Sequence, residues 1–285
     1  MGGYEARMRE FRNPTERTVA HYVMVEADEV GDGAEGDVRL EGVAEIPDHI
    51  RGPGGGVAVG ALLTMADNAA GLTGGLAALP DNWVVTTSLM FEHVRPTAVG
   101  PLGFETSILR AGRQAIVSRV GYVDLGADRA PVAEVVLTSA VLHPDGGAPK
   151  IERPARMVPA RVPDPDRAFL PFADFIGIEV DASGRYVLEG RSEFGNPWGF
   201  LHGGVVASLI DASAMGAAAP RLEGPGVVTS ALVNYLAPNR VGPIVAHHRV
   251  VGPRGRGVVV RVELHDEGAG GRRTVVATVT VDPLD

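Results

Sequence analysis

The second half of the chain contains one long segment with the hydrophobic period of an α-helix, at about 205–219. Apolar and small residues recur there at intervals of three and four, at Val206, Leu209, Ile210, Ser213 and Ala217. This spacing places them on one face of a helix. Many of the remaining positions are alanine, serine or glycine, which let a sheet approach closely. The pattern predicts a single, tightly packed helix.

Runs rich in β-branched residues flank this helix and predict strands. One run, 184–191, precedes it, and 227–236, 244–251, 258–264 and 274–281 follow it. The first half has the same order, with a strand at 37–46, a glycine-rich loop and an apolar helix. Its later strands are expected at 83–94, 102–109, 115–123 and 132–142.

The two halves also match residue by residue. Positions 60–67 match 204–211 at an offset of 144 (Asp211 against Asp67), and 87–91 match 229–233 at an offset of 142 (Thr229 against Thr87). Shared identities, order and near-constant offset indicate an internal duplication.

The fold class expected is α+β, with two tandem units that each pack a long helix on an antiparallel sheet. The units are assigned to 31–143 and 167–285, with a leader at 1–30 and a proline-rich linker at 144–166. A short helix is expected at 6–12. We expect the two sheets to pair edge to edge, as the subunits of a homodimer do.

Composition excludes several classes of protein. The chain has 285 residues, a net charge of −9 and no cysteine. The charge argues against nucleic acid or an anionic membrane as a partner, and the lack of cysteine excludes disulfides and thiolate catalysis. The start lacks the apolar core of a signal peptide, and no apolar run reaches the ~18 residues that span a bilayer. A cytoplasmic protein is therefore expected.

The candidate chemistry lies just before the second helix. Asn196 is followed by His202, Gly203 and Gly204, and Asp211 comes within the helix. Backbone N–H groups at a helix N-terminus stabilise developing negative charge, and a nearby acid can supply a base or a nucleophile. The two glycines could also serve a tight turn with positive φ.

This pattern resembles the hotdog-fold acyl-CoA thioesterases of the phenylacetate-degradation (PaaI-like) group. Residues 170–285 carry the full motif, whereas residues 35–143 match in helix and strands, so the whole chain resembles a tandem double hotdog. The resemblance implies hydrolysis of an acyl-CoA thioester to free acid and CoA. It implies no metal and no cofactor beyond the coenzyme A of the substrate.

The resemblance also implies residue roles. The Gly203 N–H polarises the thioester carbonyl, Asn196 positions substrate or water, and His202 orients the loop. A helix aspartate acts as nucleophile or general base, and a threonine on the next strand holds the water.

In family dimers the loop of one subunit faces the acid of the other. The first copy has Gly52, Ala58 and Val59 where the second has Asn196, His202 and Gly203. One competent site per chain is therefore expected. It combines Asn196, His202 and Gly203 with Asp67 and with Thr87 or Thr86, while Asp211 faces Ala58, Val59 and Gly60.

Further candidates are less specific. The expected substrate contacts are Gly204, Trp198, Thr86, Ser88 and Thr229. Phe200, like Trp198, fits either an acyl pocket or a loop anchor. Thr87 and Thr229 also fit ordinary strand positions. The run 52–56 is expected to be a flexible connection rather than a phosphate loop. Arg95, Arg113, Arg240, Arg254 and Arg256 are candidates for the phosphates of coenzyme A. His247 and His248 alternate across a strand and predict no metal site.

Two other functions remain open at this stage. A hotdog hydratase or dehydratase needs a base in the loop, where this chain has Asn196. A non-catalytic acyl-CoA-binding protein would account for the altered loop of the first copy. The sequence does not indicate the acyl chain. The expected partner is a small acyl-CoA, and further pairing into a homo-oligomer is open.

Overall fold

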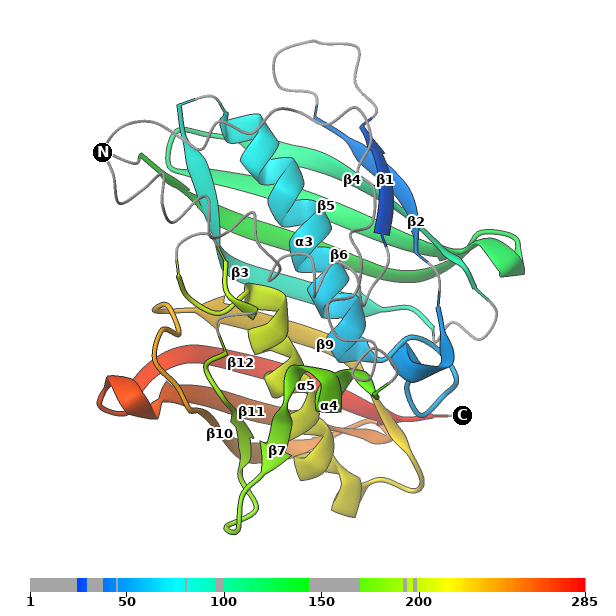
Figure 1. Ribbon diagram of the computed structural model, residues 1–285. Coiled ribbons are helices and arrows are strands. Elements are labelled where there is room, and N and C mark those ends of the chain that lie inside the picture. Colours follow the sequence, from blue (N-terminus) through cyan, green and yellow to red (C-terminus); the bar gives the residue numbers. More distant parts are fainter. Residues whose placement is uncertain are drawn as a thin grey trace.

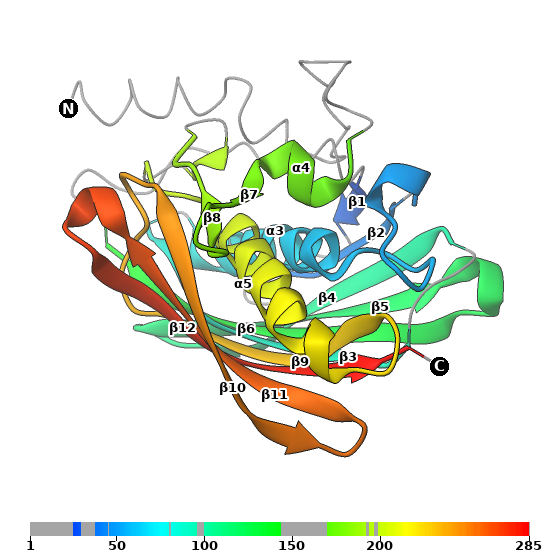
Figure 2. The same cartoon turned by 90° about the horizontal axis from the view of Figure 1, so that it is seen from below.

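The computed structural model describes residues 25–29, 38–44, 46–79, 81–95, 100–143, 170–191, 194–196 and 199–284. The helix expected at 6–12, the linker at 144–166 and Trp198 lie outside these residues. The described strands form one 12-stranded antiparallel sheet, and the two long helices lie together on one of its faces (Figures 1 and 2).

The first unit contains one long helix and six strands among the described residues. The elements are β1 (Val25–Glu29), β2 (Leu40–Ala44), η1 (Asp48–Ile50), α3 (Val59–Ala78), β3 (Trp83–His93), β4 (Leu102–Ala111), β5 (Ala115–Asp124), η2 (Leu125–Ala127) and β6 (Ala130–Leu142). Its strands are ordered β1-β2-β4-β5-β6-β3 in the sheet.

The second unit repeats this plan. Its elements are α4 (Phe172–Ile176), β7 (Ile178–Val180), β8 (Tyr186–Leu188), α5 (Gly203–Ala218), η4 (Ala219–Arg221), β9 (Gly226–Tyr235), β10 (Ile244–Arg254), β11 (Gly257–Asp266), η5 (Glu267–Ala269) and β12 (Arg272–Pro283). The strand order β9-β12-β11-β10-β8-β7 mirrors that of the first unit. The expected α+β chain of two repeated units is confirmed.

The two units join through β3 and β9, which pair antiparallel at the centre of the sheet. Leu89 opposes Val233 there, and both side chains are fully buried on the face toward the helices. Pairing these strands removes two exposed sheet edges, which otherwise promote aggregation. The expected edge-to-edge sheet is therefore present within one chain.

The two long helices meet near their N-termini, where small residues allow close approach. A Cβ atom on Gly204 would lie 2.5 Å from the Thr64 Cα, and one on Gly60 would lie 3.0 Å from the Ser208 Cβ. The hydroxyl of Ser208 donates across this contact to the Gly60 carbonyl over 2.9 Å. The repeated small residues thus fix the start of each helix against the other.

Candidate active site

Asp67 on α3 is surrounded by groups from both units. The residue is buried, with 6% of its surface exposed. Its Oδ1 accepts the hydroxyl of Thr86 on β3 over 2.8 Å, and its Oδ2 accepts the Gly204 N–H at the start of α5 over 2.9 Å. The Nδ1 atom of His202 lies 3.2 Å from the same Oδ2. The acid of the first unit therefore lies against the loop of the second.

His202 is the N-cap residue of α5, and its Nδ1 atom also lies 3.2 Å from the Gly204 nitrogen. A single ring nitrogen cannot accept from Gly204 and donate to Asp67 at once. Because the Gly204 N–H makes its shorter bond, 2.9 Å, to Asp67, we assign the proton to Nδ1, which then donates to the carboxylate. The imidazole thereby ties the loop to the acid.

Gly203 and Gly204 are required for space and not for a left-handed backbone. Neither has a positive φ, so the alternative that they serve a left-handed turn is wrong. The described residue with a positive φ in this loop is Gly199, at 75°. A Cβ on Gly203 would lie 2.8 Å from the Asp67 Oδ2. Any side chain there would push the carboxylate away. Gly203 is the first residue of α5, where N–H groups lack intrahelical acceptors.

The loop before α5 is an ordered turn around Asn196. The Asn196 N–H donates to the Phe200 carbonyl over 2.7 Å, and its Oδ1 accepts the Phe200 N–H over 3.3 Å. The Arg240 guanidinium lies 5.4 Å from the centre of the Phe200 ring. Asn196 thus shapes the loop, and Phe200 lies beneath an arginine.

The loop of the first copy has the same backbone bonds without the polar side chains. The Gly52 N–H donates to the Gly56 carbonyl over 2.7 Å, as Asn196 does to Phe200, and the Gly55 N–H donates to the Gly52 carbonyl over 3.0 Å. The Arg51 guanidinium also donates to the Gly55 carbonyl. These bonds close the glycine run into a turn like that of the second copy.

Asp211 on α5 occupies the equivalent place in the second half, with fewer partners. Its Oδ2 accepts the Gly60 N–H over 3.1 Å, the counterpart of the Gly204–Asp67 bond. Ala58 and Val228 stand where His202 and Thr86 stand in the first half. Burial raises the pKa of the Asp211 carboxyl to about 7, and the Gly60 N–H only partly opposes this. Asp211 therefore holds a proton more readily near neutral pH than an ordinary aspartate does.

The strand threonines differ in what they contact. Thr86 reaches Asp67, whereas the hydroxyl of Thr87 donates to the Thr138 carbonyl over 3.0 Å. The β3–β6 register shifts between Thr86 and Ser88, and Thr87 is the extra residue at that bulge. The expectation that Thr87 contacts the acid is therefore wrong. Ser88 opposes Asn234 where β3 meets β9.

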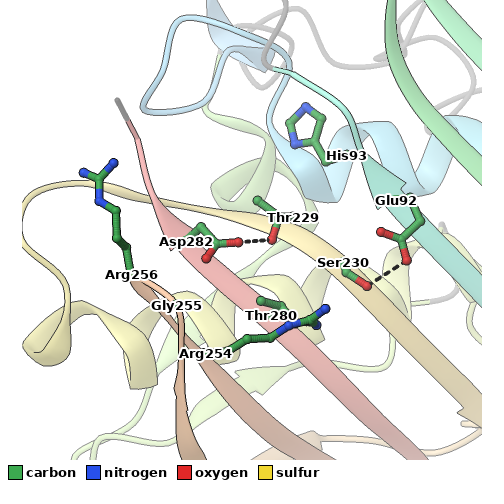
Figure 3. A pocket seen from close by; sticks show the side chains of 9 residues that line it. All are labelled: Glu92, His93, Thr229, Ser230, Arg254, Gly255, Arg256, Thr280 and Asp282. Atoms are coloured by element: carbon green, nitrogen blue, oxygen red, sulfur yellow. Dashed lines mark hydrogen bonds between the residues drawn. The ribbon is translucent and has the colours of Figure 1, made fainter.

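Thr229, the counterpart of Thr87, lines a surface pocket of about 390 Å³ where strands of the second half meet the end of β3 (Figure 3). Its hydroxyl donates to Asp282, and that of Ser230 donates to Glu92 over 3.0 Å. Arg254 donates to the Thr280 hydroxyl, and Figure 3 shows Arg256 pointing away from Arg254. The pocket therefore mixes both charges, and its two arginines do not form a joint anion clamp.

The other candidate arginines lie apart. Arg95 donates to the Pro131 carbonyl, Arg113 lines a second pocket at the end of α3, and Arg240 lies over Phe200. The five arginines thus do not converge on Asp67. Over the described part of the chain, no group of three or more His, Asp or Glu is placed to hold a metal ion.

Tyr235, at the end of β9, is a site residue that sequence reasoning missed. Its hydroxyl donates to the Gly203 carbonyl over 2.8 Å. Burial raises the pKa of the Tyr235 phenol well above its usual value, and the Asp67 charge raises it further. The alternation of side chains along the strand could have identified it, because Tyr235 shares the helix-facing side of β9 with Ala231 and Val233.

Comparison with known proteins decides the family. Two segments, residues 54–126 and 199–280, match the thioesterase superfamily and together cover more than half of the chain. The chain belongs to the thioesterase superfamily. The duplicated match agrees with the tandem double-hotdog fold. A search of curated proteins found no match by sequence.

Several solved structures are similar in fold to this member of the thioesterase superfamily. The tesB protein of Mycobacterium avium subs paratuberculosis has a TM-score of 0.59 and 13% identity, covering 96% of this chain and 100% of its own. The 12:0-ACP thioesterase of Umbellularia californica also has a TM-score of 0.59 and 13% identity, over 86% and 94%. An acyl-ACP thioesterase of Bacteroides thetaiotaomicron follows at 0.56 and 12%, over 86% and 98%. None of the described helices is long and apolar enough to cross a membrane.

Proposed function

We propose that this chain hydrolyses an acyl-CoA thioester to the free acid and CoA, at one composite site between its two units. The observation that carries the proposal is the set of donors around Asp67. A buried carboxylate there meets a helix N-terminus, an imidazole and a hydroxyl at 2.8–3.2 Å. Hydrolysis of a thioester needs a polarised carbonyl and an activated oxygen nucleophile, and this arrangement supplies both.

The Gly203 N–H binds the thioester oxygen as it becomes negative. This N–H lies at the positive end of α5, and donors that are already oriented in a water-poor site stabilise such an oxyanion strongly. Asp67 either attacks the carbonyl carbon or removes a proton from the attacking water. In both routes the C–S bond breaks, the sulfur leaves as CoA thiolate and takes up a proton, and water supplies the acid's new oxygen.

Thr86 and His202 hold Asp67 for this step. The Thr86 hydroxyl occupies Oδ1, and Nδ1 of His202 donates to Oδ2, so the carboxylate cannot rotate freely. Asn196 shapes the turn that presents Gly203 and, within the PaaI-like subtype that we propose, its amide also positions the substrate or water.

The second half lacks these supports. Asp211 has the Gly60 N–H, yet Ala58 and Val228 replace the imidazole and the hydroxyl. Its raised pKa also leaves much of the carboxyl protonated near neutral pH. We therefore propose a single competent site per chain.

A screen of CoA thioesters tests this function, with release of free thiol as the readout. Short, medium, long and aryl chains are compared, together with acyl-ACP, because relatives in fold include acyl-ACP thioesterases. We expect turnover of at least one CoA thioester that is lost in Asp67→Asn. Measurable binding of every thioester without thiol release would instead indicate a non-catalytic acyl-CoA-binding protein.

A further inference from the structure

The peptide unit between Gly203 and Gly204 is held at both ends. Its carbonyl oxygen accepts the Tyr235 hydroxyl over 2.8 Å, and its N–H donates to the Asp67 Oδ2 over 2.9 Å. The two bonds come from different units, because Tyr235 lies on β9 and Asp67 on α3. The plane of this peptide is thereby fixed relative to the acid.

The orientation of this peptide sets the position of its neighbours. The Gly203 N–H belongs to the preceding peptide unit, which is joined to the anchored unit at the Gly203 Cα. Release of the carbonyl would let the anchored peptide rotate away from Asp67 and would loosen that shared Cα. Shifts of about 1 Å in a reacting geometry can cost about 100-fold in rate. A hydroxyl that prevents the rotation therefore acts on turnover without touching the substrate.

The corresponding residue of the first unit does not make this contact. His93 on β3 is the counterpart of Tyr235 at an offset of 142, and its Nδ1 lies 3.2 Å from the Val228 carbonyl. It thus bonds to strand β9 and not to the first turn of α3. The tyrosine contact is present in the half that has His202 and Gly203.

We propose that Tyr235 is a positioning residue for thioester hydrolysis, which holds the Gly203–Gly204 peptide so that the Gly204 N–H faces Asp67 and the Gly203 Cα, which links this peptide to the Gly203 N–H, stays in place. This inference rests on the proposed function. Tyr235 remains protonated over the working pH range, since burial and the nearby Asp67 charge both raise its pKa. Its hydroxyl is therefore a donor throughout.

Tyr235→Phe tests the proposal, because it removes the hydroxyl and keeps the ring. We expect kcat for the best CoA thioester to fall about 10- to 100-fold while KM changes less than about threefold. We also expect the Gly204 amide to exchange with deuterium about tenfold faster or more, measured by NMR. Tyr186→Phe is the matched control, because the Tyr186 hydroxyl lies next to Gly216, far along α5.

The two readouts separate this proposal from the proposed function. A Tyr235→Phe variant with kcat within about twofold of the parent overturns the positioning role, and so does a loss of kcat with unchanged Gly204 exchange. If the parent chain hydrolyses no thioester, the proposed function fails, and Gly204 exchange alone still decides whether Tyr235 holds the peptide.

Discussion

The N–H of Gly204 on the second helix donates to the Asp67 carboxylate on the first helix over 2.9 Å. The reciprocal bond, from Gly60 to Asp211, is 3.1 Å long. Each helix thus presents its first turn to the acid of the other. What distinguishes the two places is the side chains around this shared backbone contact, since only Asp67 has both a hydroxyl and an imidazole among its described partners.

Asp67→Asn is expected to lower kcat about 1,000-fold, because the amide can neither accept a proton nor attack the carbonyl. Asp211→Asn, its counterpart in the duplication, is expected to keep kcat within about threefold of the parent. Steady-state release of free thiol measures both. An inactive Asp211→Asn beside an active Asp67→Asn would overturn the crossed site.

Asp211→Asn is also expected to change the pH dependence of stability. Burial raises the folded-state pKa of Asp211 to about 7, above the usual value near 4. The folded state therefore binds this proton more tightly than the unfolded state does. Ionisation of Asp211 lowers the free energy of unfolding as pH rises from about 4 to about 7. The variant should gain about 1–3 kcal/mol at pH 8 and little near pH 4.

Urea unfolding of parent and variant at both pH values measures that difference. Because a neutral amide cannot titrate, the stabilisation should grow with pH. An equal change at the two pH values would show that the effect is not one of ionisation.

Thr86→Val is expected to lower kcat about tenfold, because Oδ1 of Asp67 loses the hydroxyl that restrains it. Thr87→Val removes a hydroxyl one residue away that donates to the Thr138 carbonyl, and its kcat should stay within about twofold. Parallel kinetics with one CoA thioester compare the pair. Equal losses in both would show that the bulge, and not the contact to Asp67, sets the rate.

Gly204→Ala is expected to destabilise the fold by about 2–3 kcal/mol or more, because the new Cβ would lie 2.5 Å from the Thr64 Cα. Gly71→Ala is the matched control on α3, where a Cβ meets nothing within 4 Å. It should stabilise by about 0.5–1 kcal/mol, since alanine favours a helix over glycine. Thermal unfolding ranks the two variants against the parent, and similar Tm values would contradict the close helix contact.

The sequence was sufficient for the duplicated plan because each long strand and helix has a clear hydrophobic period. The runs at 115–123 and 258–264, for example, became β5 (Ala115–Asp124) and β11 (Gly257–Asp266). It missed β1 (Val25–Glu29), which pairs with β2 although it lies in the expected leader at 1–30. It also missed α4 (Phe172–Ile176) and β7 (Ile178–Val180), and all three are too short to show a period. Short elements depend on tertiary packing that a local pattern does not contain.

Within the candidate site, motif spacing identified the groups but not every contact. The choice between Thr86 and Thr87 depends on a bulge, whose register is set by the partner strand β6. The turn at 52–56 was not predicted because backbone bonds close it, and the second copy makes the same bonds with a different sequence. Tyr235 was missed because its partner, Gly203, is a backbone carbonyl in another element.

The junction between β3 and β9 has a consequence for how the protein behaves on dilution. In a homodimer, sites that combine residues of two subunits disappear when the subunits separate at low concentration. Here the same strand pairing lies within one polypeptide, so Asp67 and Gly204 meet at a fixed effective concentration. Specific activity per chain should therefore stay constant from micromolar to subnanomolar protein, and each half is free to mutate without altering its counterpart.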